Sequence, residues 1–238
     1  MELAGQTALV TGANRGIGRR FVAELLARDV RKVYAGIRNP DAADQEMREH
    51  PRVELVRLDI TDTDAVEAAA HLAEDVSVLI NNAGISTSQP LLEADVDTVR
   101  CEIETHVFGT LSMARAFAPA LRAHQGAMAN ILSALSWFSY PGSGAYSAAK
   151  AAEWSLTNSL RLELAPAGVL VQGVHLGAAD TDISAGYEGP KIDPTDVARF
   201  SLDGIENNQT EVLVDDWSRT VKAALTSEPN AVLTALAG

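Results

Sequence analysis

The sequence predicts an α/β fold, with one doubly wound, mainly parallel sheet of seven strands and helices on both faces. Short apolar, β-branched runs alternate along the 238 residues with longer segments of helical length. The runs carry few charges, which is typical of strands buried on both faces of a parallel sheet. Such alternation indicates right-handed crossovers between neighbouring strands. Since no linker or internal repeat interrupts the pattern, residues 1–238 are predicted to form a single domain.

Each expected element follows from this alternation. The strands are the apolar runs 7–10, 32–37, 53–58, 76–80, 127–132, 169–175 and 211–214. The helices are the segments 16–28, 42–49, 63–73, 95–123, 145–164 and 195–207, with a further helix after Asp215. Pro166 and Gly168 should stop the long helix 145–164, because proline forbids its continuation and glycine tolerates positive φ. Asp193 or Thr195 can cap the next helix.

Composition and charge argue against several classes of function. Acidic residues outnumber basic ones by 32 to 19, for a net charge of −13, and such a surface repels nucleic-acid backbones and anionic lipids. We therefore expect no nucleic-acid and no membrane partner. Cys101 is the only cysteine, and the five histidines lack metal-ligand spacing, so no disulfide and no metal site is expected. Without a secretory signal or a span-length apolar run, the protein is predicted to be cytoplasmic.

The first strand runs directly into a glycine-rich turn, and a helix follows. Glycines allow the backbone to approach a pyrophosphate, and the helix N-terminus offers it free N–H groups and a positive dipole end. This strand–turn–helix context favours a dinucleotide site over a merely structural turn. The expected contacts are Gly12, Asn14, Arg15, Gly16, Ile17 and Gly18.

The end of the second strand indicates which nicotinamide cofactor is bound. A cofactor with a bare 2′-hydroxyl is usually held by an acid at this point. Here the strand ends in Arg38 instead, and a guanidinium can meet a 2′-phosphate with a bidentate fork. Arg15 could reach the same phosphate. The sequence therefore favours NADP(H) over NAD, the alternative being that both arginines are solvated surface charges.

Two residues four positions apart in a predicted helix form a candidate catalytic pair. Tyr146 and Lys150 stand on one helix face, one turn apart. A tyrosine with its ordinary pKa of about 10 is a poor base, but a nearby ammonium lowers that pKa and allows proton exchange. An ordinary surface pair is the alternative. Ser133 directly follows the strand 127–132, where it can donate a hydrogen bond to a substrate oxygen at the sheet edge.

Taken in order, these motifs resemble the short-chain dehydrogenase/reductase family over nearly the whole chain. The shared patterns are G-x-x-x-G-x-G, Asn-Asn-Ala-Gly at 81–84, and the spacing Ser133–x₁₂–Tyr146–x₃–Lys150. The resemblance implies a Rossmann-type fold and hydride transfer between NADP(H) and a carbonyl or alcohol. It further implies that Ser133 orients the substrate oxygen, that Tyr146 supplies the proton, and that Lys150 tunes Tyr146 and binds the cofactor ribose.

The same resemblance implies further cofactor contacts. Asp59 and Ile60 resemble the pair that contacts the adenine, and Gly177 allows close approach to the nicotinamide. The complete added set is Asp59, Ile60, Asn82, Ala83, Gly84, Tyr146, Lys150, Gly177, Ala179 and Thr181.

Two positions depart from the family pattern. His106 stands where the family usually has an asparagine that kinks a helix and anchors a water linked to the lysine. An imidazole can also hold a water, so His106 is a candidate catalytic residue, or it merely fills space in the helix. Leu176 replaces a proline, which frees one backbone dihedral and adds an apolar side chain near the reacting centre.

The sequence indicates only the class of substrate and the kind of assembly. An apolar or aromatic ketone or aldehyde would suit the lining Leu135, Trp137, Tyr140, Leu176 and Tyr187, unless these side chains pack in the core or at a subunit contact. The segment 184–191 is predicted to be either a lid or a plain loop. In the family, the helices 95–123 and 145–164 pair across a two-fold axis, which implies a homodimer or homotetramer. An NAD-dependent alcohol dehydrogenase and a non-catalytic NADP-sensing module are the alternative functions.

Overall fold

The computed structural model describes residues 1–226, so the end of the predicted domain, 227–238, lies outside the described residues. Its centre is a seven-stranded sheet in the order β3-β2-β1-β4-β5-β6-β7, and every neighbouring pair is parallel. The predicted doubly wound sheet is confirmed. The strands are β1 Thr7–Thr11, β2 Lys32–Ile37, β3 Val53–Arg57, β4 Val78–Asn81, β5 Ala127–Ile131, β6 Leu170–His175 and β7 Glu211–Leu213.

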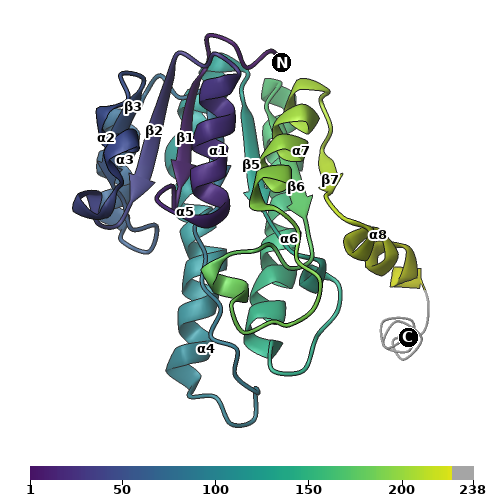
Figure 1. Cartoon of the computed structure of the whole chain (residues 1–238). Helices are drawn as coiled ribbons and strands as arrows, with labels where there is room; N and C mark the ends of the chain where they lie inside the picture. Colours follow the sequence, from purple (N-terminus) through teal and green to yellow (C-terminus); the bar gives the residue numbers. More distant parts are fainter. Residues whose placement is uncertain (227–238) are drawn as a thin grey trace.

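Helices cover both faces of the sheet, and each face has its own core (Figure 1). Along β1, Ala8 and Val10 point into one core, whereas Leu9 points into the other, as the two-residue period of a strand requires. The first core packs α1 Gly16–Ala27, α2 Gln45–Glu49 and α7 Pro194–Glu206. The second packs α3 Thr63–Leu72, α5 Thr110–His124 and α6 Gly144–Leu164. The last helix, α8 Asp216–Ala223, follows β7.

Two predicted helices were wrong as single elements. The segment 95–123 consists of α4 Val96–Ile103, a π-helical turn Glu104–Gly109, and α5. At this junction the hydroxyl of Thr105 donates to the carbonyl of Cys101 at 2.9 Å, a back-bond that bends helices. Of the segment 42–49, Ala42 is the last residue of the 3₁₀ turn Pro40–Ala42. Helix α2 starts only after Asp44, whose side chain accepts from Met47 N at 2.8 Å.

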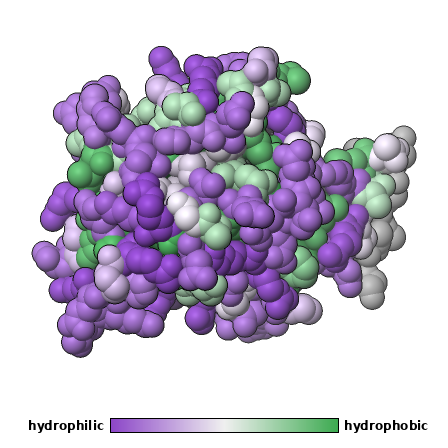
Figure 2. All heavy atoms as spheres, turned by 90° about the horizontal axis from the view of Figure 1, so that it is seen from above, coloured by the Kyte–Doolittle hydropathy of each residue, from purple (hydrophilic) through white to green (hydrophobic). Residues whose placement is uncertain are grey.

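The order of the strands determines where a ligand can bind. The chain leaves β1 for β2 on one side and returns to β4 on the other, so a crevice opens at the carboxyl ends of β1 and β4. In Figure 1 the strands point downward, and α4, the start of α6 and the segment between β6 and α7 lie around that lower end. The opposite end, seen in Figure 2, is mostly hydrophilic. None of the helices among residues 1–226 is long and apolar enough to cross a membrane.

Candidate active site

The glycine-rich turn disfavours or excludes a side chain at each of its three glycine positions. Gly12 and Gly16 have φ of +64° and +52°, in the left-handed region that favours glycine. A Cβ on Gly18 would lie 2.2 Å from the carbonyl oxygen of Gly12 and 2.6 Å from Nδ2 of Asn82. The N-cap residue of α1, Arg15, makes no side-chain cap, and the first turn holds no acid. The free N–H groups of this turn therefore fit an anionic pyrophosphate.

Hydrogen bonds tie the glycine turn to the ends of the neighbouring strands. Asn82 Nδ2 donates to Thr11 O at 2.9 Å, and the backbone amides of Asn82 and Ala83 donate to Thr11 Oγ1 at 2.9 and 3.0 Å. On the other side, Ala13 N donates to Gly36 O at 3.1 Å. The predicted cofactor contacts after β4, Asn82 and Ala83, thus border the same turn as the end of β2.

The two arginines predicted to bind the 2′-phosphate differ in their surroundings. Arg38 is exposed, two residues beyond the contact between Gly36 and the turn, and forms no ion pair within residues 1–226. Arg15 is also exposed, but its guanidinium lies 2.6 Å from the carboxylate of Asp182, in the segment after β6. An ion pair between exposed side chains contributes little and is readily exchanged for another anion.

The adenine pair predicted from the resemblance lies after β3. Asp59 is half-buried and accepts hydrogen bonds from the amide and hydroxyl of Thr61 at 3.0 and 2.7 Å. Ile60 is buried in the second core, where it packs against Gly109 of the π-helical turn.

Ser133, Tyr146 and Lys150 come together at the carboxyl end of β5. Ser133 follows this strand, is buried, and accepts a hydrogen bond from Leu135 N at 3.1 Å, which begins a 3₁₀ turn. Tyr146 lies in the first turn of α6, and the side chain of Ser133 acts on it to lower its pKa, against the larger effect of burial. Lys150 Nζ lies 5.7 Å from the centre of the tyrosine ring. The predicted catalytic spacing therefore corresponds to one cluster.

The electrostatics of Tyr146 correct one expectation. We expected the lysine to bring the tyrosine pKa below its ordinary value. Burial instead raises the pKa of Tyr146, and this outweighs the lowering effect of the Lys150 charge. Tyr146 is therefore a neutral phenol, which is the form that can donate a proton.

Lys150 has a partner that the sequence analysis missed. Its ammonium donates to Ile131 O and to Oε2 of Glu153, both at 2.7 Å. Burial lowers the pKa of Lys150, but Glu153 and Tyr146 outweigh burial and leave this pKa above its ordinary value. Glu153 lies three residues after Lys150, on the same helix face, and this spacing could have revealed it.

His106 lies against the same cluster. Its ring packs edge-on against Tyr146, with centroids 5.3 Å apart, and Nε2 lies 2.8 Å from Ile85 O. Among the described residues 1–226, Nδ1 has no hydrogen-bond partner, and it lies 3.7 Å from Oε2 of Glu153. Burial, followed by the charge of Lys150, lowers the pKa of His106 to about 3, so the imidazole is neutral. His106 thus packs against Tyr146 of the catalytic cluster and lies close to Glu153.

The residues after β6 reach the glycine turn from the other side of the crevice. A Cβ on Gly16 would lie 3.2 Å from Cγ2 of Thr181, so Thr181, a predicted cofactor contact, borders the turn. Gly177 N donates to Asp215 Oδ2 at 2.7 Å. Ala179 pairs with Ile192 in a short bridge that closes the base of the segment between them. Whether this segment acts as a lid stays a prediction.

The structure does not gather the five predicted substrate contacts into one lining. Leu176 is buried in the first core. Trp137 stacks on His175, with centroids 3.8 Å apart, and packs edge-on against Trp154 at 6.3 Å. Leu135 is half-buried, whereas Tyr140 and Tyr187 are exposed. Leu176 and Trp137 therefore pack against the protein, as the alternative interpretation allowed.

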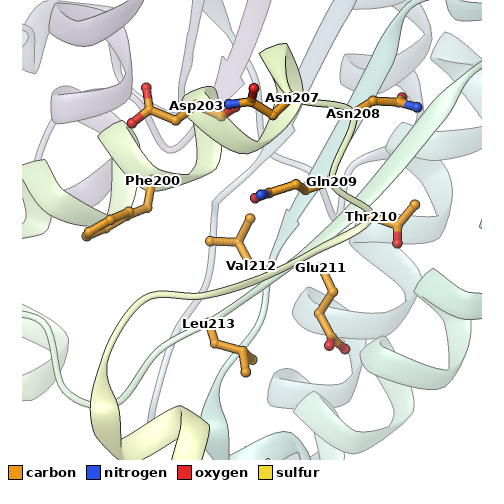
Figure 3. Close-up of a pocket in the computed structure, with 9 residues that line it drawn as sticks. All are labelled: Phe200, Asp203, Asn207, Asn208, Gln209, Thr210, Glu211, Val212 and Leu213. Atoms are coloured by element: carbon orange, nitrogen blue, oxygen red, sulfur yellow. The ribbon is translucent and has the colours of Figure 1, made fainter.

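A separate groove lies at the sheet edge (Figure 3). It is lined by Phe200, Asp203 and residues 207–213, from the end of α7 and from β7. None of the catalytic or cofactor residues named above lines it. Within residues 1–226, no group of three or more His, Cys, Asp or Glu side chains is arranged to hold a metal ion.

Comparison with known proteins identifies the family. The sequence model of the short chain dehydrogenase family matches residues 6–190, well over half of the chain. The chain belongs to this family. This short-chain dehydrogenase is therefore an oxidoreductase, and the resemblance inferred from the motifs is confirmed.

Individual members of the family are similar over most of their length. The crystal structure of a short chain dehydrogenase from Burkholderia cenocepacia in complex with NADP has a TM-score of 0.94 and 39% identity, covering 99% of each chain. Carbonyl reductase [NADPH] 2 of Sus scrofa is 32% identical, over 74% of this chain and 72% of its own. Trans-4-hydroxycyclohexanecarboxylate dehydrogenase of Sinomonas cyclohexanicum is 32% identical, over 79% and 77%.

Proposed function

We propose that this short-chain dehydrogenase is an NADP(H)-dependent carbonyl reductase, which interconverts a carbonyl group and an alcohol. The observation that carries the proposal is the cluster of Ser133, Tyr146 and Lys150 beside the glycine turn. A continuous set of contacts joins the two parts: Asn82 bonds to the turn, a Cβ on Gly84 would meet His106 at 2.7 Å, and His106 packs on Tyr146.

The residues around the crevice fit the cofactor. The amides at the start of α1 would hold the pyrophosphate, and Arg38 with Arg15 would hold the 2′-phosphate. The NADP bound to the B. cenocepacia protein, which is 39% identical, supports this choice of cofactor. When bound, the cofactor supplies or accepts the hydride.

The protein residues would position the substrate and move its proton. In reduction, the neutral phenol of Tyr146 would donate its proton to the carbonyl oxygen, and Ser133 would hold that oxygen by a hydrogen bond. An ammonium has three N–H donors, and Lys150 uses two on Ile131 O and Glu153. The third remains for a ribose hydroxyl.

The substrate class is the less specific part of the proposal. The exposed rings of Tyr140 and Tyr187 are available to an apolar or aromatic ketone or aldehyde. The similarity to pig carbonyl reductase supports this class, while the Sinomonas relative, named as the dehydrogenase of a cyclic hydroxy acid, makes secondary alcohols worth testing in the reverse direction.

The experiment is to follow NADPH absorbance with a panel of aromatic and aliphatic ketones and aldehydes. Tyr146→Phe keeps the ring but removes the proton donor, so turnover should fall by about 10²–10⁴-fold while NADPH affinity stays nearly unchanged. Lys150→Ala should damage both. Full activity of Tyr146→Phe on a good substrate would refute the mechanism. Absence of turnover with any substrate, together with tight NADPH binding, would favour the sensing module. A preference for NADH would favour the NAD-dependent alcohol dehydrogenase.

We also propose that the protein is a cytoplasmic homodimer or homotetramer built from single domains. Several large apolar side chains on the helices predicted to pair are exposed, among them Val96, Phe108 and Leu162. Burial of these side chains against a second copy would remove apolar surface from water. A monomer mass that does not depend on concentration in light scattering would contradict this assembly.

A further inference from the structure

Glu153 is a built part of the site that the motifs do not include, and the proposed mechanism names it only as a partner of Lys150. Its side chain is 3% exposed, yet both carboxylate oxygens have partners. Oε2 accepts from Lys150 Nζ at 2.7 Å, and Oε1 accepts from the hydroxyl of Thr110 at 3.0 Å. A carboxylate without partners would be very costly to bury, so this site is arranged to hold the charge.

The position of Glu153 determines the direction of the ammonium. With Ile131 O on β5 and Glu153 on α6, two of three donors of Lys150 are fixed by the protein before any ligand binds. The ammonium can therefore present only its remaining N–H to the crevice. This arrangement limits the rotation of a flexible side chain at the point where it must meet the cofactor.

Glu153 also changes the field at Tyr146. A bare ammonium beside a phenol favours the phenolate, whereas an ammonium paired with a carboxylate has little net charge. Four titratable side chains surround the phenol: Lys150 and Glu153 from α6, Glu102 from α4, and His106 from the π-helical turn. Glu102 is fully buried and His106 is neutral, so Lys150 is the one cation among these four.

We propose that Glu153 is a positioning residue, which anchors the ammonium of Lys150 and screens its charge from Tyr146, so that Tyr146 stays a neutral proton donor. The catalytic role of Glu153 rests on the proposed function. The effect of Glu153 on Lys150 and Tyr146 is a property of the protein without substrate. The raised pKa of Tyr146, to which burial contributes first and the Glu153 charge adds, agrees with this role.

The test is the ionisation of Tyr146 in Glu153→Gln, which keeps the shape of the side chain and removes its charge. Tyrosinate absorbance is recorded against pH for the wild type and for Glu153→Gln. Because the chain contains four tyrosines, each titration is corrected by subtracting that of the same protein carrying Tyr146→Phe as well. The difference belongs to Tyr146. The matched control is Glu163→Gln, which removes the same charge from an exposed position on α6.

We expect Tyr146 to ionise at least about one pH unit lower in Glu153→Gln, since a neighbouring charge typically moves a pKa by about 1–3 units. Glu163→Gln should leave the titration unmoved. With a substrate in hand, the alkaline limb of kcat/KM for reduction should move down by the same amount, and the KM for NADPH should rise severalfold. Should Glu153→Gln not fold, Glu153→Asp withdraws the charge by one methylene and should give a smaller shift in the same direction.

An unmoved Tyr146 titration in Glu153→Gln, or in Glu153→Asp if only that variant folds, would overturn the inference. The titration uses no substrate, so the two failures are separable. A protein that reduces no carbonyl compound, yet shows the shift, refutes the proposed function alone. A protein that reduces carbonyl compounds, yet shows no shift, refutes the role of Glu153 alone.

Discussion

Replacement of Gly18 by alanine tests whether close approach at the glycine turn is what the fold and the cofactor site require. The added Cβ would lie 2.2 Å from Gly12 O, more than about 1 Å inside ordinary contact distance. Because that oxygen belongs to the backbone, the turn or the start of α1 must move. The movement would also disturb the hydrogen bonds from Asn82 Nδ2 to Thr11 O at 2.9 Å and Gly12 O at 3.4 Å.

The expected cost follows from these contacts. Overpacking of this kind costs about 1–3 kcal/mol, and a weakened buried hydrogen bond adds about 1 kcal/mol. For a domain of this size, about 2–4 kcal/mol corresponds to a fall in Tm of about 5–15 °C. Because the N–H groups of α1 move with the turn, the increase in Tm caused by NADPH should shrink as well.

Thermal unfolding with and without NADPH, followed by circular dichroism, measures both effects. Gly186→Ala is the matched control, since a Cβ there meets nothing within 4 Å and the residue does not have a left-handed φ. The control should unfold within about 1–2 °C of the wild type. If Gly18→Ala also unfolds there, and NADPH stabilises it fully, the reasoning about close approach is wrong.

Three further predictions follow from exposed and buried charges. Arg38→Asp should weaken NADPH by at least about tenfold while changing NADH much less, because it replaces a phosphate-binding fork by a repelling carboxylate; equal losses in steady-state KM would contradict NADP as the cofactor. Asp182→Asn frees Arg15 from an ion pair of 2.6 Å and should lower the KM for NADPH by up to about fivefold, with the KM for NADH unchanged. His106 and His175 have pKa values lowered from 6.5 to about 3, so between pH 6.5 and about 3 the unfolded chain binds more protons than the folded protein. The stability that these two residues allow is therefore fully present above pH 6.5 and is lost as the pH falls from 6.5 towards 3. In urea unfolding, His175→Gln should reduce this slope by about 1.4 kcal/mol per pH unit, and an unchanged slope would show that His175 is protonated in the native state.

The sequence alone predicted the parts of this protein that depend on local patterns. Apolar, β-branched runs predicted all seven strands, and the low number of charges in most of them predicted a parallel sheet covered on both faces. The spacing of Ser133, Tyr146 and Lys150 predicted their cluster through its resemblance to the family pattern, whereas one helix turn accounts only for the closeness of Tyr146 and Lys150.

The parts that failed depend on contacts between segments far apart in the chain. One partner of Lys150 is Ile131 O, which lies on a strand and not on the helix of Lys150. The burial of Tyr146 depends on α4 and the π-helical turn, so the net direction of the pKa shift of Tyr146 could not be predicted from the helix pattern. Trp137 stacks on His175, a residue 38 positions away, and this choice between ligand contact and protein contact is made by the tertiary structure.

The π-helical turn Glu104–Gly109 has a consequence for changes in chain length. A π turn holds more residues than an α turn, so it behaves as an insertion absorbed within a continuous helix. Deletion of one residue from this turn would restore α geometry, and each residue of an α-helix accounts for about 100° of rotation. Either α4 or α5 would then have to rotate by that amount, which would turn Phe117 and Met113 out of the second core or Glu102 out of its buried position. Among members of the family that share this turn, insertions and deletions should therefore accumulate in the loop before α4, and the number of residues between Glu102 and Met113 should stay constant.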